Sequence, residues 1–482
     1  MISITNRVLI YLLGGVFFVA AGCYAYWQEV YFLGAPVALV AIVLLIQHPK
    51  YLFSLLMLSI PWSVEYSFDS NLGTDLPDEP LMLLAALSIL IYLAYRRDIK
   101  WFRNLHPVII LILLQFLWVV VTVITSTDIL LSVKYLLAKS WYLLAFVALP
   151  LYLIRDEKAL KRSFGLLLLS MIAVIIVSLT RHGVLNFAFG KVNDALYPFF
   201  RNHVNYSALL IFMVPLLIAA TQLASSKMAR IFLYCLLSII FVAGYFSYAR
   251  GAWLGLIAGL IAYWLLRKRL LVFSFLLFLT VMVGTVFWFR SKERFLGLSN
   301  DYKSTIYHKN FREHLIATYQ LKDLSNAERL YRWIAGVRMV KDSWQTGFGP
   351  STFYHQYKSY TLPAFRTYVS DNREHSTVHN YFLLTLIEQG MLGCLLFISL
   401  LIALLSYCQI IYFRTKEKFW RVFISAVASI LIMQCVINFL SDMIETDKVG
   451  SVFYLCVAVI IIADLKTRKE TSDPSANIQS IS

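Results

Sequence analysis

The chain has 482 residues, of which 60% are hydrophobic and 15% are charged, whereas about 25% of residues are charged in a soluble domain. Its 34 Phe, 29 Tyr and 11 Trp are more than the aqueous core of such a chain can hide, so lipid must solvate much of the surface. The composition excludes a soluble enzyme, and the net charge of +16 indicates membrane topology rather than nucleic-acid binding.

Apolar runs long enough to cross a hydrocarbon layer of about 30 Å recur along almost the whole chain. They predict an all-α polytopic membrane protein with about 12 to 14 transmembrane helices. The third run is short and ends at Pro61, as a half-span or re-entrant segment would. The runs lie near residues 8–26, 30–46, 50–62, 81–95, 107–126, 140–154, 163–180, 204–223, 229–248, 251–266, 270–289, 391–413, 421–440 and 449–465. The first run lacks a cleavage pattern, so we expect a membrane helix rather than a signal peptide.

The runs divide the chain into four predicted parts. Transmembrane helices occupy residues 1–289 and 379–465, and one large helical loop of residues 290–378 separates them. The polar tail of residues 466–482 is predicted to be disordered.

Lysine and arginine are unevenly distributed between the two sides of the membrane. With a cytoplasmic N-terminus, 22 of them lie in inside loops and only seven in the short outside loops: Lys134, Lys139, Arg181, Lys191, Arg201, Arg250 and Lys448. The positive-inside rule therefore predicts that both termini are cytoplasmic. The middles of the predicted spans contain essentially no ionisable side chain, which disfavours a path for ions or charged solutes.

The large outside segment is unusually basic for its side of the membrane. It holds fourteen Lys and Arg between Arg290 and Arg373, against eight acidic residues. An anionic ligand such as a lipid diphosphate explains this excess, and so does a basic surface against anionic headgroups.

The first of three local patterns is a tight turn between two predicted helices at Arg250-Gly251. Gly251, Gly255 and Gly259 form a face on which another helix can pack closely. Arg250 is then expected at the outer membrane surface beside a helix N-terminus, where backbone amides and a guanidinium together bind phosphate. An interfacial anchor is the alternative role for this arginine.

The second pattern is a helix predicted across Asn326 to Arg338 in the outside segment. Arg329, Arg332 and Trp333 share one face of it, since residues three and four positions apart are neighbours on a helix. The stretch from Asp342 to Pro350 predicts the helix end and a Gly-rich turn. A purely structural helix on the membrane surface is the alternative.

In the third pattern, a polar loop leads into an apolar helix around His379 and Asn380. We expect both residues in the first turn, Ser376 or Thr377 as the cap, and Glu388 two to three turns below. A neutral imidazole near a helix N-terminus suits a general base. A capping role for His379 is the alternative.

Metal and nucleotide chemistry have little support in the sequence. His375 and His379 are four residues apart, and His355 is a possible third ligand, but no HExxH pattern or suitably spaced carboxylate accompanies them. The chain also lacks a GxSxG elbow, a Walker loop and a GxGxxG after a strand. We therefore predict no cofactor and no metal.

Together and in this order, the three patterns resemble the O-antigen ligase and O-antigen polymerase family of bacterial envelope glycosyltransferases, over roughly residues 200 to 400. The residues that carry the resemblance are Arg250-Gly251, Arg329, Trp333, Gly347-Phe348-Gly349, His379-Asn380, Glu388, Gly390 and Gly393.

The resemblance implies a glycan donor linked to undecaprenyl diphosphate and a site on the periplasmic face of the bacterial inner membrane. It also implies transfer without metal or nucleotide, onto lipid A core or onto another glycan. His379 is then the expected general base, and Asn380 is expected to orient the acceptor or the imidazole. Because planar guanidinium groups bind phosphate oxygens bidentately, Arg250 and Arg329 are the first candidates for the diphosphate, with Arg201 and Arg332 as the second.

The sequence thus predicts an inverting, metal-independent glycosyltransferase, with O-antigen ligase favoured. A polymerase of the same family and a protein O-glycosyltransferase stay open. A lipid-linked glycan flippase is the alternative from another class, which internal repeats, broken mid-membrane helices and buried charge would support. The expected partners are the lipid-linked donor, the acceptor and membrane lipid, with no nucleic acid.

Overall fold

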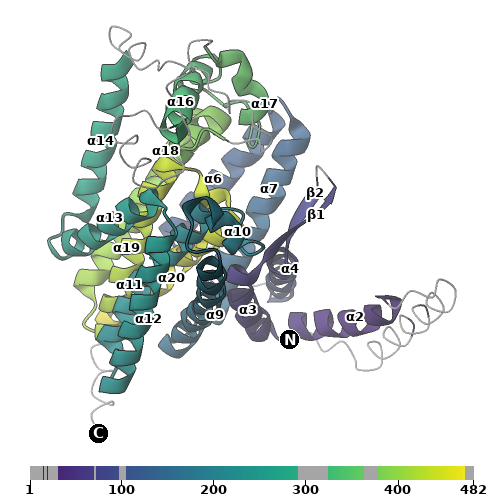
Figure 1. Cartoon of the computed structure of the whole chain (residues 1–482), viewed down its shortest axis with the longest axis vertical. Helices are drawn as coiled ribbons and strands as arrows, with labels where there is room; N and C mark the ends of the chain where they lie inside the picture. The colour runs from purple at the N-terminus through teal and green to yellow at the C-terminus, as the bar shows by residue number, and fades with distance from the viewer. Residues whose placement is uncertain are drawn as a thin grey trace. The chain divides into compact units, whose positions relative to one another are not determined.

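The computed structural model in Figure 1 describes residues 15, 19, 31–69, 72–96, 105–290, 324–362 and 377–472. The predicted first span lies outside the described residues except for Gly15 and Val19. The chain forms two compact units. One comprises Met1–Arg103 with Trp141–Ser170, and the other comprises Asn104–Ser140 with Met171–Ser482.

The first unit contains a bend between the second and third predicted runs, and a small hairpin. Its described elements are α2 (Tyr31–Gln47), α3 (Pro49–Ser59), η1 (Ile60–Trp62), β1 (Val64–Asp69), β2 (Leu72–Leu76), α4 (Asp78–Arg96), the π-helical turn η2 (Leu144–Ala148), α8 (Leu149–Leu153) and the first part of α9 (Glu157–Val184). The axes of Leu39–Gln47 and Pro49–Trp62 differ by 110°, as in a broken span or a re-entrant loop. The antiparallel strands pair Val64 with Leu76.

The second unit carries every residue predicted for the site. Its described elements are α6 (Pro107–Ile124), most of α7 (Ile129–Leu143), the last part of α9, η3 (Phe189–Lys191), α10 (Val192–Leu196), α11 (His203–Leu223), α12 (Lys227–Phe246), α13 (Arg250–Arg267), α14 (Leu271–Arg290), α16 (Leu324–Asp342), α17 (Phe353–Tyr357), η5 (Lys358–Tyr360), α18 (Tyr381–Arg414), α19 (Lys418–Leu440), η7 (Met443–Glu445) and α20 (Asp447–Ser472). In Figure 1, α16 and α17 lie at one end of this bundle, where they pack on α18.

The chain is an all-α polytopic membrane protein. Within the described ranges, nine helices are long and apolar enough to cross a membrane, or ten if the bent pair forms one span. The predicted runs at 251–266 and 270–289 are helices α13 and α14. Helix α13 is not among the candidate spans, and α14 counts as a shorter apolar helix over Leu271–Thr285. The upper part of the predicted range of 12 to 14 spans therefore depends on these two helices and on residues outside the described ranges.

Helices α13 and α19 pack closely through the glycine face predicted from the sequence. A Cβ atom on Gly259 would lie 2.3 Å from Cε of Met433, and one on Gly255 would lie 3.5 Å from Cγ1 of Ile437. At the end of the face, a Cβ on Gly251 would lie 3.5 Å from Leu440. The glycines thus bring the start of α13 against the end of α19.

Two boundaries predicted from the sequence are wrong. Lys139 is not in an outside loop, because α7 begins at Ile129 and continues into the candidate span Ile129–Leu153, in which Lys139 is 9% exposed. The two lysines of α7 lower its hydropathy, and this makes the first half of the helix resemble a loop. The helix α20 also continues to Ser472, into the stretch predicted as a disordered tail.

A buried ion cluster joins three helix ends at the other end of the second unit. Asp464, which is 0% exposed, accepts from Nη2 of Arg414 at 2.7 Å and from Nε of Arg468 at 2.7 Å. Nδ1 of His106 accepts from the Val108 amide, so Nε2 carries the hydrogen that faces Asp464 at 3.1 Å. The cluster ties the N-terminus of α6 to the C-terminal ends of α18 and α20.

Candidate active site

The N-terminus of α18 presents His379 in an unusual backbone conformation. His379 has φ +53° and precedes the helix. Asn380 is the N-cap, because its side-chain oxygen accepts from the Leu383 amide at 3.0 Å. The cap is therefore not Thr377, and Ser376 lies outside the described residues. Both His379 and Asn380 come just before the first turn instead of within it.

A break in α18 at Gly390 receives the Gly-rich turn of the preceding loop. Gly390 has φ +68°, so the helix loses its regular hydrogen bonds there. Instead, the amides of Phe348 and Gly349 donate to the carbonyl oxygens of Ile387 and Glu388 at 3.0 and 2.9 Å, and the Met391 amide donates to the Trp344 carbonyl at 2.8 Å. The turn thus replaces the missing helical partners.

The carboxylate of Glu388 holds the segment that follows this turn. It accepts from the amides of Ser351 at 3.0 Å and Phe353 at 3.1 Å, and so caps α17. The α6–α7 connection adds a third support, since the Thr127 amide donates to the Phe348 carbonyl at 2.9 Å. Glu388 and the α6–α7 connection therefore fix the Gly-rich turn and the start of α17 against α18.

The helix α16 is hydrogen-bonded to the residues just before α18. Arg332 is 3% exposed, and its Nη1 donates to the Thr377 carbonyl at 2.9 Å while its Nε faces Glu328 at 3.4 Å. Nε1 of Trp333 donates to the Val378 carbonyl at 3.0 Å. Arg329 is half-buried one turn before Trp333, on the predicted shared face. The predicted helix face is therefore confirmed, and it holds the residues next to His379.

Asp442, which was not among the residues predicted from the sequence, lies beside His379. Its Oδ1 atom is 3.9 Å from Nδ1 of the imidazole. The connection that carries it, between α19 and α20, is fixed to α18 because the Tyr381 amide donates to the Ser441 carbonyl at 3.1 Å. The available signal in the sequence was an acidic residue in a short connection on the same predicted side as His379.

The surroundings of His379 favour a neutral imidazole. Burial lowers the pKa of His379 to about 3, with further contributions from the positive charges of Arg329 and Arg332. Burial also raises the pKa of Asp442 above its ordinary value, although a hydrogen bond from Thr377 opposes the shift. A neutral imidazole with a free nitrogen is the form that accepts a proton.

The two remaining predicted arginines, Arg250 and Arg201, lie at or just before the starts of α13 and α11. Arg250 is the first residue of α13, half-buried, beside the contact between Gly251 and Leu440. Since Asp442 follows Leu440 by two residues, Arg250 and His379 both border the α19–α20 connection. Arg201 is exposed before α11, and the Lys448 ammonium donates to the Phe199 carbonyl of the same turn. The structure thus brings Arg329 and Arg332 to His379. The start of α13, with Arg250, lies against the end of α19, whereas the turn before Arg201 is held by the start of α20.

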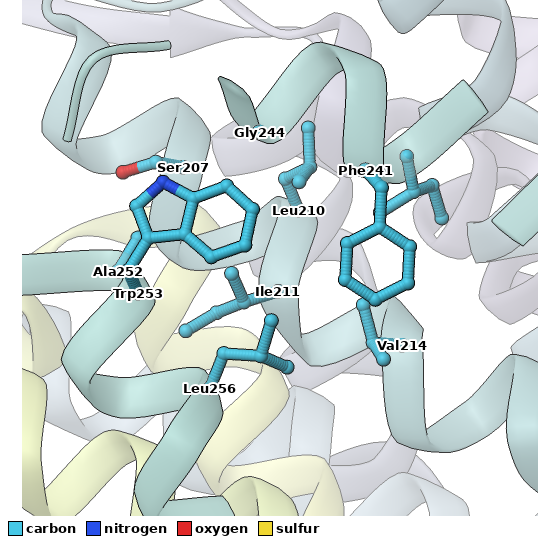
Figure 2. Close-up of a pocket in the computed structure, with 10 residues that line it drawn as sticks. Ser207, Leu210, Ile211, Val214, Phe241, Gly244, Ala252, Trp253 and Leu256 are labelled. Carbon is cyan, nitrogen blue, oxygen red and sulfur yellow. The ribbon is translucent and has the colours of Figure 1, made fainter. Parts of the chain in front are cut away.

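A small apolar groove is lined by residues that include Ala252 and Trp253, less than one turn after Arg250 in α13. Helices α11, α12 and α13 contribute its walls. Figure 2 shows the ring of Trp253 facing Ser207 and Leu210 on one side and Phe241 closing the other. Its lining is nearly all aliphatic or aromatic, so it suits a hydrocarbon chain.

Within the described residues, no group of three His, Cys, Asp or Glu side chains could hold a metal ion. His375 lies outside these residues. Tyr357 is buried, stacks on Phe353 at 5.2 Å and lies under the Arg332 guanidinium at 5.6 Å. Tyr357 thus supports Arg332 from within the loop.

Residues 233–398 match the family model described as O-antigen ligase. This range includes Arg250, Arg329, Arg332, His379 and Asn380, whereas Arg201 and Asp442 lie outside it. Comparison with curated proteins gave no match. The order of the motifs agrees with this match, so residues 233–398 are similar to the O-antigen ligase family.

Proposed function

We propose that this protein transfers a glycan from undecaprenyl diphosphate to a sugar hydroxyl on the periplasmic face of the bacterial inner membrane. The family that residues 233–398 match implies a glycosyltransferase of the O-antigen ligase or polymerase type. The observation that carries the finer proposal is the imidazole of His379, flanked by Asp442 and by Arg329 and Arg332. Displacement of a diphosphate from a sugar needs a base that deprotonates the acceptor and cations that neutralise the leaving group, and both kinds of group are present here.

In the proposed reaction, His379 acts as general base. Its Nδ1 faces Asp442, so Nε2 is available to take the proton of the acceptor hydroxyl. The hydroxyl oxygen attacks the anomeric carbon from the face opposite the diphosphate, and the bond from that carbon to the diphosphate oxygen breaks. The anomeric centre inverts, and the diphosphate leaves with the bonding electron pair.

Arginines neutralise the charge that develops on the leaving group. We assign Arg329 and Arg250 to the diphosphate oxygens, because a guanidinium donates two parallel hydrogen bonds to them. Arg332 is committed to Glu328 and the Thr377 carbonyl, so its proposed role is to position the residues before His379. The exposed Arg201 is proposed to attract the donor at the mouth of α11.

The groove below Arg250 is proposed to hold the polyprenyl chain next to the diphosphate. Its apolar lining supports this assignment, and only a short stretch of the chain can lie against it. The rest of the chain would then lie in the bilayer, beside α12, whose candidate span is only 17% buried.

A transfer assay with purified protein in liposomes tests the proposal. His379→Ala should lower kcat by about 10²–10⁴-fold, the range for loss of a general base. His355→Ala, at an exposed histidine of α17, is the matched control and should keep full activity. Wild-type turnover in His379→Ala would overturn the assignment of the base.

Conservative arginine variants test the diphosphate assignment. Arg329→Lys and Arg250→Lys keep the charge but lose the planar fork, so each should lower kcat/KM by at least about tenfold. Arg230→Lys, at an exposed position near the start of α12, is the control.

The predicted metal independence requires that activity survives prolonged treatment with a chelator.

The ligase is favoured over the polymerase as in the sequence interpretation, and products from a deletion strain distinguish them. Accumulated lipid-linked polymer identifies a ligase, whereas accumulated single repeat units identify a polymerase. The broken helix α18 and the buried Lys139 are features that a flippase would also have. Movement of the lipid-linked glycan across liposomes without a new glycosidic bond would favour that activity.

A further inference from the structure

Lys139 is a buried cation inside a candidate membrane span. It lies in the span Ile129–Leu153 and is only 9% exposed. An ionisable side chain within a span carries a large desolvation cost unless it has a partner, and it points to function. The mechanism proposed above does not use it.

The partner of Lys139 is Glu445, in the turn η7 between α19 and α20. Nζ of Lys139 lies 3.9 Å from Oε1 of Glu445. Tyr135, one turn earlier in α7, donates from its hydroxyl to the same oxygen at 3.1 Å and accepts from Lys139 at 3.5 Å. The ring of Tyr454 covers the ammonium at 5.3 Å. Glu445 is thus tied to α7 by a cation and a hydroxyl.

The connection that carries Glu445 also carries Asp442. The two carboxylates are three residues apart, and the turn between them is fixed where the Ile444 amide donates to Oδ1 of Asn438 at 2.9 Å. At the start of the connection, the carbonyl of Ser441 receives the Tyr381 amide at 3.1 Å. A displacement of Glu445 would therefore move the backbone that sets Asp442 against His379.

We propose that Lys139 is a positioning residue for the transfer reaction, acting through Glu445 to hold Asp442 beside His379. This inference rests on the proposed function for its catalytic consequence. Removal of one member of a buried ion pair leaves an uncompensated charge, whereas removal of both can be nearly neutral. If Lys139 is lost, Glu445 moves toward water, and the connection shifts with it.

The test compares Lys139→Met, Glu445→Gln and the double variant in the full-length protein. Each single change should lower kcat by about 10–100-fold with the KM for the donor within about twofold, because the substrate arginines are untouched. The double variant should recover to within about fivefold of the wild-type kcat, since no buried charge is left unpaired. The matched control is Lys134→Met, at an exposed lysine of the same helix, which should leave kcat unchanged.

A second measurement does not depend on glycan transfer. Carbethoxylation of His379 by diethyl pyrocarbonate, followed by peptide mass spectrometry, reports the accessibility of the imidazole. Its rate should change by about threefold or more in Lys139→Met and return toward the wild-type rate in the double variant. The rate for His355 in the same samples should stay constant. If the wild-type protein transfers no glycan, the proposed function fails, and the labelling still decides the positioning role.

Two results would overturn the proposal. One is a Lys139→Met protein with unchanged kcat and unchanged labelling of His379. The other is a double variant no better than the worse single variant, because the two residues then act independently. If Lys139→Met does not fold, Glu445→Gln takes its place, and unchanged kcat and labelling in that variant count against the role in the same way.

Discussion

The amide of Gly349 donates to the carbonyl oxygen of Glu388 at 2.9 Å, while the side chain of Glu388 caps the helix that follows Gly349. Two motifs that lie far apart in the sequence are therefore one structural unit. The break at Gly390 exposes the carbonyl oxygens, and the Gly-rich turn supplies the amides. Their joint function is to fix the loop that carries Arg329 against the helix that begins after His379.

The glycine at position 390 should be indispensable for stability. Gly390→Ala places a Cβ atom 2.2 Å from the Gln345 carbonyl oxygen at φ +68°. We expect a loss of about 2–5 kcal/mol from the left-handed backbone and the clash together, measured by thermal unfolding in detergent. Gly284→Ala, in α14 with nothing within 4 Å of the new Cβ, is the control and should unfold no earlier than wild type. An unchanged midpoint for Gly390→Ala would refute this view of the break.

The positive φ of His379 predicts an unusual order of stability between two inactive variants. At φ +53°, glycine is free of the steric cost that alanine carries, so His379→Gly should be about 1 kcal/mol more stable than His379→Ala. In the middle of α7, the order should reverse, and Lys134→Gly should be about 1 kcal/mol less stable than Lys134→Ala. Thermal unfolding of the four variants checks both orders, and the same order at both positions would contradict the prediction.

The low pKa of His379 predicts how the protein responds to acid. Because burial and the nearby arginines lower this pKa to about 3, the folded protein keeps the imidazole neutral at pH 5. The unfolded chain, with an ordinary value of about 6.5, binds a proton there. His379 therefore contributes a loss of stability as pH falls from about 6.5 toward 3, and no loss above this range.

Carbethoxylation measures this titration directly, since only the neutral imidazole reacts. The rate for His379 should stay level from pH 8 to pH 5 after correction for hydrolysis of the reagent, whereas the rate for a histidine-containing reference peptide should fall below about pH 6.5. Inorganic pyrophosphate should raise the pKa, because an anion on Arg329 reduces the repulsion of the imidazolium. If the labelling rate of His379 halves near pH 6.5 without pyrophosphate, its pKa is not lowered and the prediction is wrong.

The ion cluster around Asp464 should be a major source of stability. Asp464→Asn leaves Arg414, Arg468 and His106 without their shared carboxylate, which we expect to cost about 3–5 kcal/mol in unfolding free energy. Arg468→Gln should cost far less, because this side chain is 52% exposed. Equal midpoints for the two variants would mean that Asp464 does not anchor the cluster.

Patterns local to one helix were predictable from the sequence. The glycine face of α13 and the arginine face of α16 follow from helical spacing alone, and both are confirmed. The predicted end of α16 and the Gly-rich turn are also confirmed. Both were predictable because glycine and proline mark turns and helix ends in the local sequence.

Relationships between distant segments were not predictable. Hydropathy places Lys139 in a loop because a charge lowers the hydropathy of its segment, and nothing near it in the sequence reveals a partner such as Glu445. Asp442 was overlooked for the same reason, since its proximity to His379 depends on how α18 and α19 pack. The break at Gly390 needs knowledge of the amides that compensate for it, and these come from another part of the chain.

The contact between α13 and α19 determines how the dimensions of the site respond to change. Gly255 and Gly259 leave no room between the helix backbones and the side chains of Ile437 and Met433, so neither helix can slide or rotate alone. Arg250 starts one helix, and Asp442 follows the end of the other. A methyl group added at Gly255 or Gly259 would thus alter the distance between Arg250 and Asp442, the carboxylate beside His379. The buried glycines of α13 therefore determine the spacing of the charged groups in the site.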